Sequence, residues 1–277
     1  MQFKKGWMIM LYERDYNSGL TPDEEKEYKE ITGREFSVKP KSGFGTVNNP
    51  AKYPKAARMC KTLFPNYFLD FVDLYDTEKI SKCNENYNSK LSQFNNERDI
   101  LNYIKETKSY HIIASILRGL SFPTGHHGTF LFPEFQLGNQ YQADYLLLAK
   151  SSGGYEFFFI EMESPCGKIT LHDGQLGHEF RDGISQLDEW KRWLQANYSS
   201  FTDTMKKYKN PNLDMPDEFY TLDLSRLHYI VVAGRRKDFN NLTYTIRREY
   251  KQDKDIHILH YDNLYDYSNL LLGVNTY

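Results

Sequence analysis

Residues 141–165 read YQADYLLLAKSSGGYEFFFIEMESP, which is two apolar segments joined by a short polar one. The two segments, Tyr141–Leu148 and Tyr155–Glu163, are rich in aliphatic and aromatic residues, and Ser151-Ser152-Gly153-Gly154 lies between them. Small, turn-forming residues between two such segments are typical of a hairpin, so the stretch predicts two antiparallel strands. A third apolar segment, Thr129–Leu137, ends at Gly138-Asn139 and extends the prediction to a meander of three strands.

The flanking sequence predicts helices and two further strands. From Ile100 onward, apolar residues recur at near-helical intervals as far as Gly119, which predicts one or two helices before the meander. After it, apolar residues spaced three, four and seven apart predict a long amphipathic helix from Gly174 to about Ala196. Strands are predicted at Tyr229–Ala233 and Ile256–Tyr261. This order of elements indicates a mixed α/β fold.

The first 95 residues are predicted to form a smaller N-terminal α+β region. Trp7–Tyr12 is an apolar run typical of a strand, and Thr21-Pro22-Asp23-Glu24 is typical of the start of a helix. Lys39–Pro54 is rich in Gly, Pro and Asn and predicts a loop. We place a domain boundary in the polar stretch Asn84–Asn96, which divides the chain into residues 1–95 and 96–277.

Composition describes a folded chain without a strong global charge. The 277 residues are 40% hydrophobic and 16% aromatic, and their formal net charge is −2, so contact with a nucleic acid requires local basic patches. Three widely spaced cysteines match neither a disulfide framework nor a zinc knuckle. The apolar runs are too short to span a membrane, and the N-terminus has no signal-peptide core, so we expect a cytoplasmic protein.

Three carboxylates are predicted to converge at one end of the meander. With a turn centred between Ser152 and Gly153, residues whose numbers add to 305 lie opposite one another, which pairs Asp144 with Glu161. Opposed side chains on one face of a sheet are about 5 Å apart, and two like charges there are destabilising. Side chains alternate along a strand, so Glu163 is expected on the same face.

A divalent cation between these carboxylates would remove the repulsion. Mg²⁺ prefers hard oxygen ligands and keeps open water positions, and it can activate a water and neutralise charge on a phosphodiester. We therefore predict Asp144, Glu161 and Glu163 as metal ligands and catalytic residues, with Mg²⁺ as the cofactor and Mn²⁺ as a substitute. The alternative is an ordinary solvated strand face.

The strings GNQYQADYLLL at residue 138, FFFIEMESP at residue 157 and DGISQLDEW at residue 182 resemble the core of the Shedu family of anti-phage defence proteins. The strings YIVVAGRRKDF and IHILHYDNL resemble its closing strands, so the resemblance covers about Thr129–Tyr265. That family belongs to the PD-(D/E)XK nuclease superfamily. The resemblance implies a restriction-endonuclease-like mixed sheet flanked by helices, a DNA substrate and assembly into homo-oligomers, typically tetramers.

The family pattern matches Asp144, Glu161 and Gln186 by position, but it has a catalytic Lys where this chain has Glu163. Glu-x-Glu variants occur among active restriction-like nucleases, and Glu163 is predicted to act as a general base or as a ligand for a second ion. Gln186 is predicted to orient a water or a carboxylate, with Gly183 permitting close approach of its helix.

Two accessory residues and one basic cluster complete the predicted site. Glu134, in FPEFQLG, resembles an acidic residue of the family, and Lys168 follows the third strand by a few residues and would return a positive charge to the site. The candidates for contact with the DNA backbone are Arg235, Arg236 and Lys237, because they directly follow an apolar strand.

Three functional hypotheses remain open at this stage. The first is a Mg²⁺-dependent DNA endonuclease or nickase of anti-phage defence. The second is a nuclease-derived sensor that binds nucleic acid ends or a phage protein with weak or no cleavage, since Glu163 replaces Lys. The third is a structural interaction protein whose 22 tyrosines and 18 phenylalanines form an aromatic interface.

Overall fold

The computed structural model describes residues 9–37 and 50–277 and contains a mixed five-stranded sheet in the order β1-β2-β3-β4-β5. The first three strands form the predicted antiparallel meander, whereas β3, β4 and β5 run parallel to one another. The strands are β1 Gly128–Leu137, β2 Tyr141–Ser151, β3 Gly154–Met162, β4 Leu227–Val232 and β5 Ile256–Leu259.

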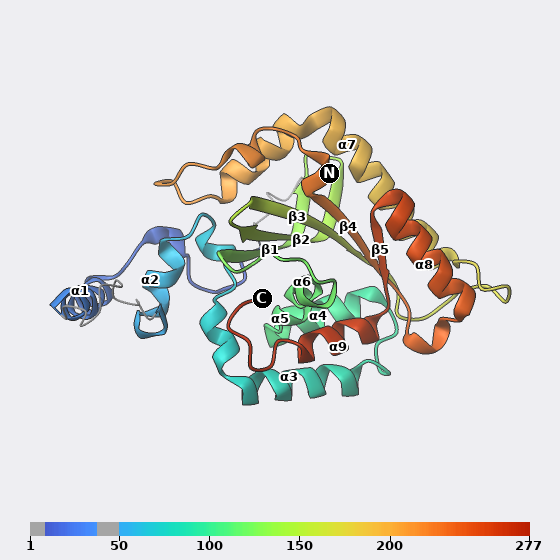
Figure 1. Ribbon diagram of the computed structural model, residues 1–277, viewed down its shortest axis with the longest axis horizontal. Helices are drawn as coiled ribbons and strands as arrows, with labels where there is room; N and C mark the ends of the chain where they lie inside the picture. The colour runs from blue at the N-terminus through green and yellow to red at the C-terminus, as the bar shows by residue number, and fades with distance from the viewer. Residues whose placement is uncertain (1–8, 38–49) are drawn as a thin grey trace, which may run out of the picture.

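Helices cover both faces of the sheet, which is why its strands are almost wholly apolar. The long helix α7 lies over one face together with α8, and α3, α4, α5, α6 and α9 lie over the other (Figure 1). The helices are α1 Pro22–Ser37, α2 Lys55–Cys60, α3 Thr77–Lys90, α4 Glu97–Thr107, α5 His111–Ala114, α6 Ile116–Gly119, α7 His178–Tyr208, α8 Asn241–Lys254 and α9 Tyr261–Asn269. The chain therefore has the predicted mixed α/β fold.

The predicted register of the hairpin is confirmed. Ser151 lies opposite Gly154 and Tyr145 opposite Ile160, so paired residue numbers add to 305. The predicted helix begins at His178 rather than Gly174 and extends to Tyr208, with a non-helical backbone at Asn197. Aromatic residues continue its apolar stripe beyond Ala196, where Tyr198 and Phe201 are buried in the sheet-facing core.

The N-terminal region is helical in the part that the structure describes. The predicted helix start at Pro22 is confirmed, whereas the strand predicted at Trp7–Tyr12 is wrong for Ile9–Tyr12. That segment is held by single contacts and not by a ladder, because the Leu11 amide donates to the Asn66 carbonyl and the Tyr12 hydroxyl to the Phe68 carbonyl. Residues 7, 8 and 39–49 of the predicted strand and loop lie outside the described residues.

Helix α3 joins the N-terminal region to the C-terminal end of the chain. The Asn84 amide donates to Asn269 at 3.0 Å, and the Tyr87 hydroxyl donates to the Tyr261 carbonyl at 3.3 Å. The division of the chain near residue 95 stays a prediction. None of the described helices is long and apolar enough to cross a membrane.

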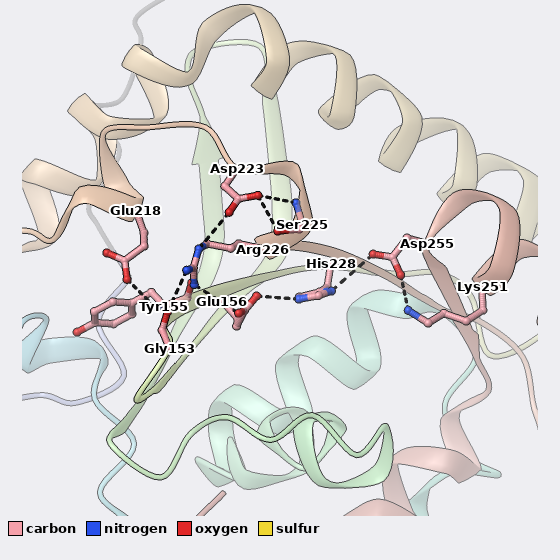
Figure 2. Close-up of polar contacts among 10 residues, drawn as sticks. All are labelled: Gly153, Tyr155, Glu156, Glu218, Asp223, Ser225, Arg226, His228, Lys251 and Asp255. Carbon is pink, nitrogen blue, oxygen red and sulfur yellow. Dashed lines mark hydrogen bonds and ion pairs between the residues drawn. The ribbon is translucent and has the colours of Figure 1, made fainter.

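A network of charged residues lies at the N-terminal ends of the three parallel strands (Figure 2). Glu156 of β3 contacts Arg226 at 3.5 Å and His228 of β4 at 3.1 Å. The other ring nitrogen of His228 lies 3.6 Å from Asp255, which forms an ion pair with Lys251 of α8. A cation lies at each end of this chain of contacts. The contacts tie α8, β4 and β3 together at the N-terminal ends of the strands, and the predicted carboxylate site lies at the other end of β3.

Candidate functional site

Asp144 is placed by an irregularity that two neighbouring strands share. The alternation of faces shifts by one residue on both strands, because Phe132 and Phe135 of β1 lie in the same core, as do Ala143 and Leu146 of β2. The ladder between the strands has no pair at Glu134 and Asp144, where the shift occurs. Irregularities of this kind re-aim side chains next to functional sites.

The Asp144 carboxylate takes over the role of a missing backbone partner. Its Oδ2 accepts a hydrogen bond of 2.7 Å from the Met162 amide, just beyond the last β2–β3 pair at Tyr145 and Ile160. This bond directs the carboxylate to the end of β3. Glu134, on the neighbouring strand, has a left-handed backbone with φ of 49°, a conformation that is strained for a non-glycine residue.

Glu161 lies at the centre of the acidic cluster and is only 7% exposed. Its Oε2 atom is buried and has no hydrogen-bond partner among the residues that the structure describes, which is rare for a buried carboxylate. Burial, followed by the charges of Asp144, Glu163 and Glu97, raises the pKa of Glu161 to about 10. The largest charge effects on Glu161 thus come from other carboxylates, which disfavour its ionised form.

Glu163 continues from β3 toward α7 and is held from two sides. Its backbone amide donates to Val232 at 2.8 Å, and its carbonyl accepts from the buried Tyr261 hydroxyl at 2.5 Å. Gln186 of α7 donates to its Oε1 at 3.3 Å, as the prediction that Gln186 orients a carboxylate requires. Burial, with Glu97 the largest charge effect, raises the pKa of Glu163 to about 8.

Gly183 permits the close contact of α7 with the ends of β3 and β4. A Cβ atom at this position would lie 2.6 Å from Val231 Cγ2 and 3.0 Å from Glu163 Cγ. These distances are shorter than carbon atoms tolerate without a shift, so any larger residue moves the helix or the carboxylate. The close approach predicted at Gly183 is confirmed.

Glu97 is a member of the cluster that sequence reasoning missed. It is the first residue of α4, and its charge raises the pKa of Asp144, Glu161 and Glu163. Burial raises the pKa of Glu97 itself. The sequence signal is Asn96-Glu97 directly before the apolar spacing of a helix, but acidic residues in a first turn are common because they interact favourably with the helix dipole.

The accessory residues differ in how near they lie to the carboxylates. Glu134 is an unpaired position of β1 beside Asp144, and its charge helps to raise the pKa of Asp144 to about 7, after burial and Glu97. Lys168 is exposed in the loop after β3, and within the described residues it forms no ion pair with a carboxylate of the cluster. The prediction that Lys168 supplies a positive charge to the site is therefore not supported by a contact among the described residues.

The predicted basic cluster after β4 is largely neutralised by α9. The Arg235 guanidinium donates to both oxygens of Asp262, at 3.0 and 2.8 Å, and Arg236 pairs with Asp266. Lys237 is exposed and has no ion-pair partner in the part of the chain that the structure describes. Only Lys237 of the three thus retains an unneutralised charge for a phosphate.

The acidic cluster supplies hard oxygen ligands, the kind that Mg²⁺ prefers. Within residues 9–37 and 50–277, no three His, Cys, Asp or Glu side chains already enclose a point at metal-ligand distances. Mg²⁺ does not require such a cage, because it usually binds through one or two carboxylates, several waters and substrate phosphates. The orphaned Oε2 of Glu161 and the all-oxygen donor set of Asp144, Glu161, Glu163 and Glu97 suit this mode of binding.

Stability without a metal should depend on pH through the same carboxylates. Their pKa values in the folded protein, about 7, 8 and 10 for Asp144, Glu163 and Glu161, exceed the roughly 4 of an unfolded chain. The folded protein therefore holds these protons more tightly, and the stability they contribute is complete below about pH 4 and lost as the pH rises through 7 to 10.

We expect the free energy of unfolding of the wild type in EDTA to fall relative to Glu161→Gln from about pH 7 to about pH 9, by up to about 1.4 kcal/mol per pH unit. Urea unfolding of both proteins across this range measures the difference. Both proteins carry the same histidines, so histidine titration cancels in the difference. A difference that stays constant with pH would show that Glu161 is ionised in the metal-free protein.

A family model described as "Shedu protein SduA, C-terminal" matches residues 80–265, about two thirds of the chain. The chain belongs to the Shedu family. The family region contains all five strands and α4, α7, α8 and the start of α9, so every carboxylate of the cluster lies inside it. No curated protein matches the chain. Membership in the Shedu family indicates a role in anti-phage defence.

Proposed function

We propose that this Shedu-family protein is a metal-dependent DNA endonuclease or nickase with a PD-(D/E)XK-type site, acting in anti-phage defence. The observation that carries the proposal is the buried carboxylate of Glu161, which lies near other acidic groups and has one oxygen without a partner in the described part of the chain. Such an arrangement is costly unless a cation occupies it during function. The cation would be Mg²⁺, with Mn²⁺ as a substitute.

Each residue of the cluster has a chemical role in this proposal. Asp144 and Glu161 would hold the cation, with Glu97 or Glu163 completing the set, and the bound cation would supply an activated water and neutralise charge on the phosphodiester. Glu163 would accept a proton from the attacking water, because its carboxylate is half-buried and its pKa lies near neutrality. Gln186 would hold the Glu163 carboxylate in one orientation through its 3.3 Å contact.

The partner and assembly proposals rest on the family resemblance. We propose DNA, of phage or plasmid origin, as the substrate, a homo-oligomer such as a tetramer as the working form, and the cytoplasm as the location. The described residues include exposed leucines and tyrosines that are compatible with self-association, among them Leu242, Leu270 and Tyr220.

A second candidate function is a nuclease-derived sensor that binds nucleic acid ends or a phage protein without turnover. The observation that favours it is Glu163 at the position of the catalytic Lys, together with the neutralised Arg235 and Arg236. This candidate predicts binding of DNA or of a phage protein by the wild type, with no cleavage in any metal.

Cleavage of supercoiled plasmid DNA tests the proposal directly. We expect nicked and linear products with Mg²⁺ or Mn²⁺, none in EDTA, and a decrease of about 10³-fold for Asp144→Asn, because loss of one cation ligand removes several kcal/mol of transition-state stabilisation. The Lys237→Ala variant should cut at a reduced rate and bind Mg²⁺ normally. If the wild type binds DNA but cuts it with neither metal, the nuclease proposal is wrong and the sensor function is favoured.

A further inference from the structure

One face of α4 borders the acidic cluster and carries exposed cationic and amide groups. Asn102 and Lys105 line a shallow hollow together with Glu134 and Asp144. Arg98, one turn nearer the helix N-terminus on the same face, contacts Glu134 at 3.4 Å. We call the three exposed residues Arg98, Asn102 and Lys105 the α4 ridge.

A DNA strand approaching the acidic cluster needs cations beside it. The cluster repels phosphate, and Glu163 adds a negative charge where the family pattern has a positive one. Arg98 lies close enough to Asp144 to lower the pKa of its carboxyl, against the larger opposing effects of burial and Glu97. The positive charge of Arg98 thus lies near the Asp144 carboxylate, at the end of β3.

Within residues 9–37 and 50–277, the contacts of Arg98 leave most of its hydrogen-bonding capacity free. Its side chain is 64% exposed, and one Nη donates to Glu134 at 3.4 Å, near the limit of a hydrogen bond. A guanidinium has five N–H donors and binds phosphate through two of them at once. Arg235 is the opposite case, since it is 18% exposed and makes two short bonds to Asp262.

Glu134 contacts Arg98 without burying its charge. The ion pair is exposed and long, so it contributes little to stability. The left-handed backbone of Glu134, with φ of 49°, is nevertheless retained beside Asp144. Strained conformations persist where a side chain must be directed to a functional position, and here the side chain is directed at Arg98.

We propose that the α4 ridge is the surface that binds the phosphates of the DNA strand to be cut, with Arg98 at the phosphate that reacts and Lys105 at a neighbouring one. The separation of seven positions between the two cations corresponds to about 10 Å along the helix. Asn102 lies between them as an uncharged donor. This inference rests on the proposed nuclease function and names the groups that contact its substrate.

Binding of a defined DNA duplex at several salt concentrations tests the ridge. We use the Glu161→Gln background, which is expected not to cut, and compare Arg98→Ala and Lys105→Ala with Lys82→Ala, a matched change of an exposed lysine on α3. Each ridge variant should weaken binding about fivefold to tenfold and reduce the slope of log K against log salt by about 1. Lys82→Ala should leave both unchanged.

Steady-state cleavage by otherwise wild-type protein separates the two roles. Arg98→Ala should lower kcat about 10²-fold and regain part of it when guanidine is added, whereas Lys105→Ala should mainly raise KM. Arg98→Lys should retain an intermediate rate because it keeps the charge but not the bidentate geometry. Melting temperatures within a few degrees of wild type show that the exposed substitutions leave the fold intact.

The outcomes separate failure of this inference from failure of the nuclease proposal. If the wild type cuts but Arg98→Ala and Lys105→Ala match Lys82→Ala in affinity and salt slope, the ridge is not the phosphate-binding surface and the nuclease stands. If the wild type neither binds nor cuts DNA, the nuclease and the ridge are both overturned.

Discussion

Replacing Glu161 by Gln is expected to abolish cleavage and, without metal, to stabilise the fold. The amide resembles the protonated carboxyl that burial favours, so the repulsion from Asp144 and Glu163 disappears. We expect the free energy of unfolding of the variant to exceed that of the wild type by about 2 kcal/mol at neutral pH in EDTA. Its cleavage rate should fall by about 10³-fold, since a cation ligand is lost.

Added Mg²⁺ distinguishes a functional site from a merely acidic surface. The wild type should gain stability with Mg²⁺ according to the affinity of the site, whereas Glu161→Gln should gain little. Calorimetric melting with and without Mg²⁺ measures this gain. Equal stabilisation of both proteins by Mg²⁺, with cleavage retained in the variant, would remove Glu161 from the site.

Glu156→Gln is the matched control, because it makes the same change on the same strand at the opposite end of β3. Glu156 contacts Arg226 and His228 in the structural network at the other edge of the sheet (Figure 2). We expect this variant to lose about 1–2 kcal/mol of stability, because a partly buried charged pair is broken, and to keep its Mg²⁺-dependent cleavage. The two variants should thus change stability in opposite directions.

Replacing Gly183 by Ala is expected to lower activity strongly although a single methyl group is added. The new Cβ would approach Val231 Cγ2 to 2.6 Å and Glu163 Cγ to 3.0 Å. Val231 is fully buried and has no room to give way, so α7 or Glu163 must move. Displacements of about 1 Å at a catalytic group cost about 10²-fold in rate, and overpacking costs about 1–3 kcal/mol of stability.

The control for this prediction is the same substitution in another helix. Among the atoms that the structure describes, a Cβ atom at Gly33 of α1 would meet nothing within 4 Å. Gly33→Ala should therefore stabilise the protein by up to about 1 kcal/mol, because alanine favours the helix, and leave cleavage unchanged. Plasmid cleavage and urea unfolding of both variants provide the comparison. A Gly183→Ala variant with wild-type rates would show that the approach of α7 does not position Glu163.

The apolar pattern was sufficient to predict the strands of the sheet and their order along the chain. The meander, the register that adds to 305 and the two closing strands follow from residues that alternate or cluster around Gly- and Ser-rich turns. Such information is local, because a strand or turn depends mainly on its own residues. The strand predicted at Trp7–Tyr12 failed over Ile9–Tyr12 since an apolar run without a partner strand does not form a ladder.

The candidate site was predicted in part. Asp144, Glu161, Glu163 and Gln186 lie together at the end of β3, and their charges or hydrogen bonds act on one another. Glu97 was missed because its role depends on how α4 lies against the sheet. Arg235 was predicted to contact phosphate, but its charge is paired with Asp262. The sequence did not reveal this pair because Asp262 lies on a helix 27 residues later.

By itself, the sequence determined the five strands of the sheet, the helices that directly precede and follow the meander, the hairpin register and the family, because these depend on local spacing and on motifs that the chain carries. The tertiary structure alone decided which charges are paired and which are not. It turned Asp144 to the Met162 amide through the shift of faces in β1 and β2, left Glu161 Oε2 without a partner and placed Arg98 beside Glu134. Burial and pairing are sums over residues distant in the chain, and only folding brings those residues together.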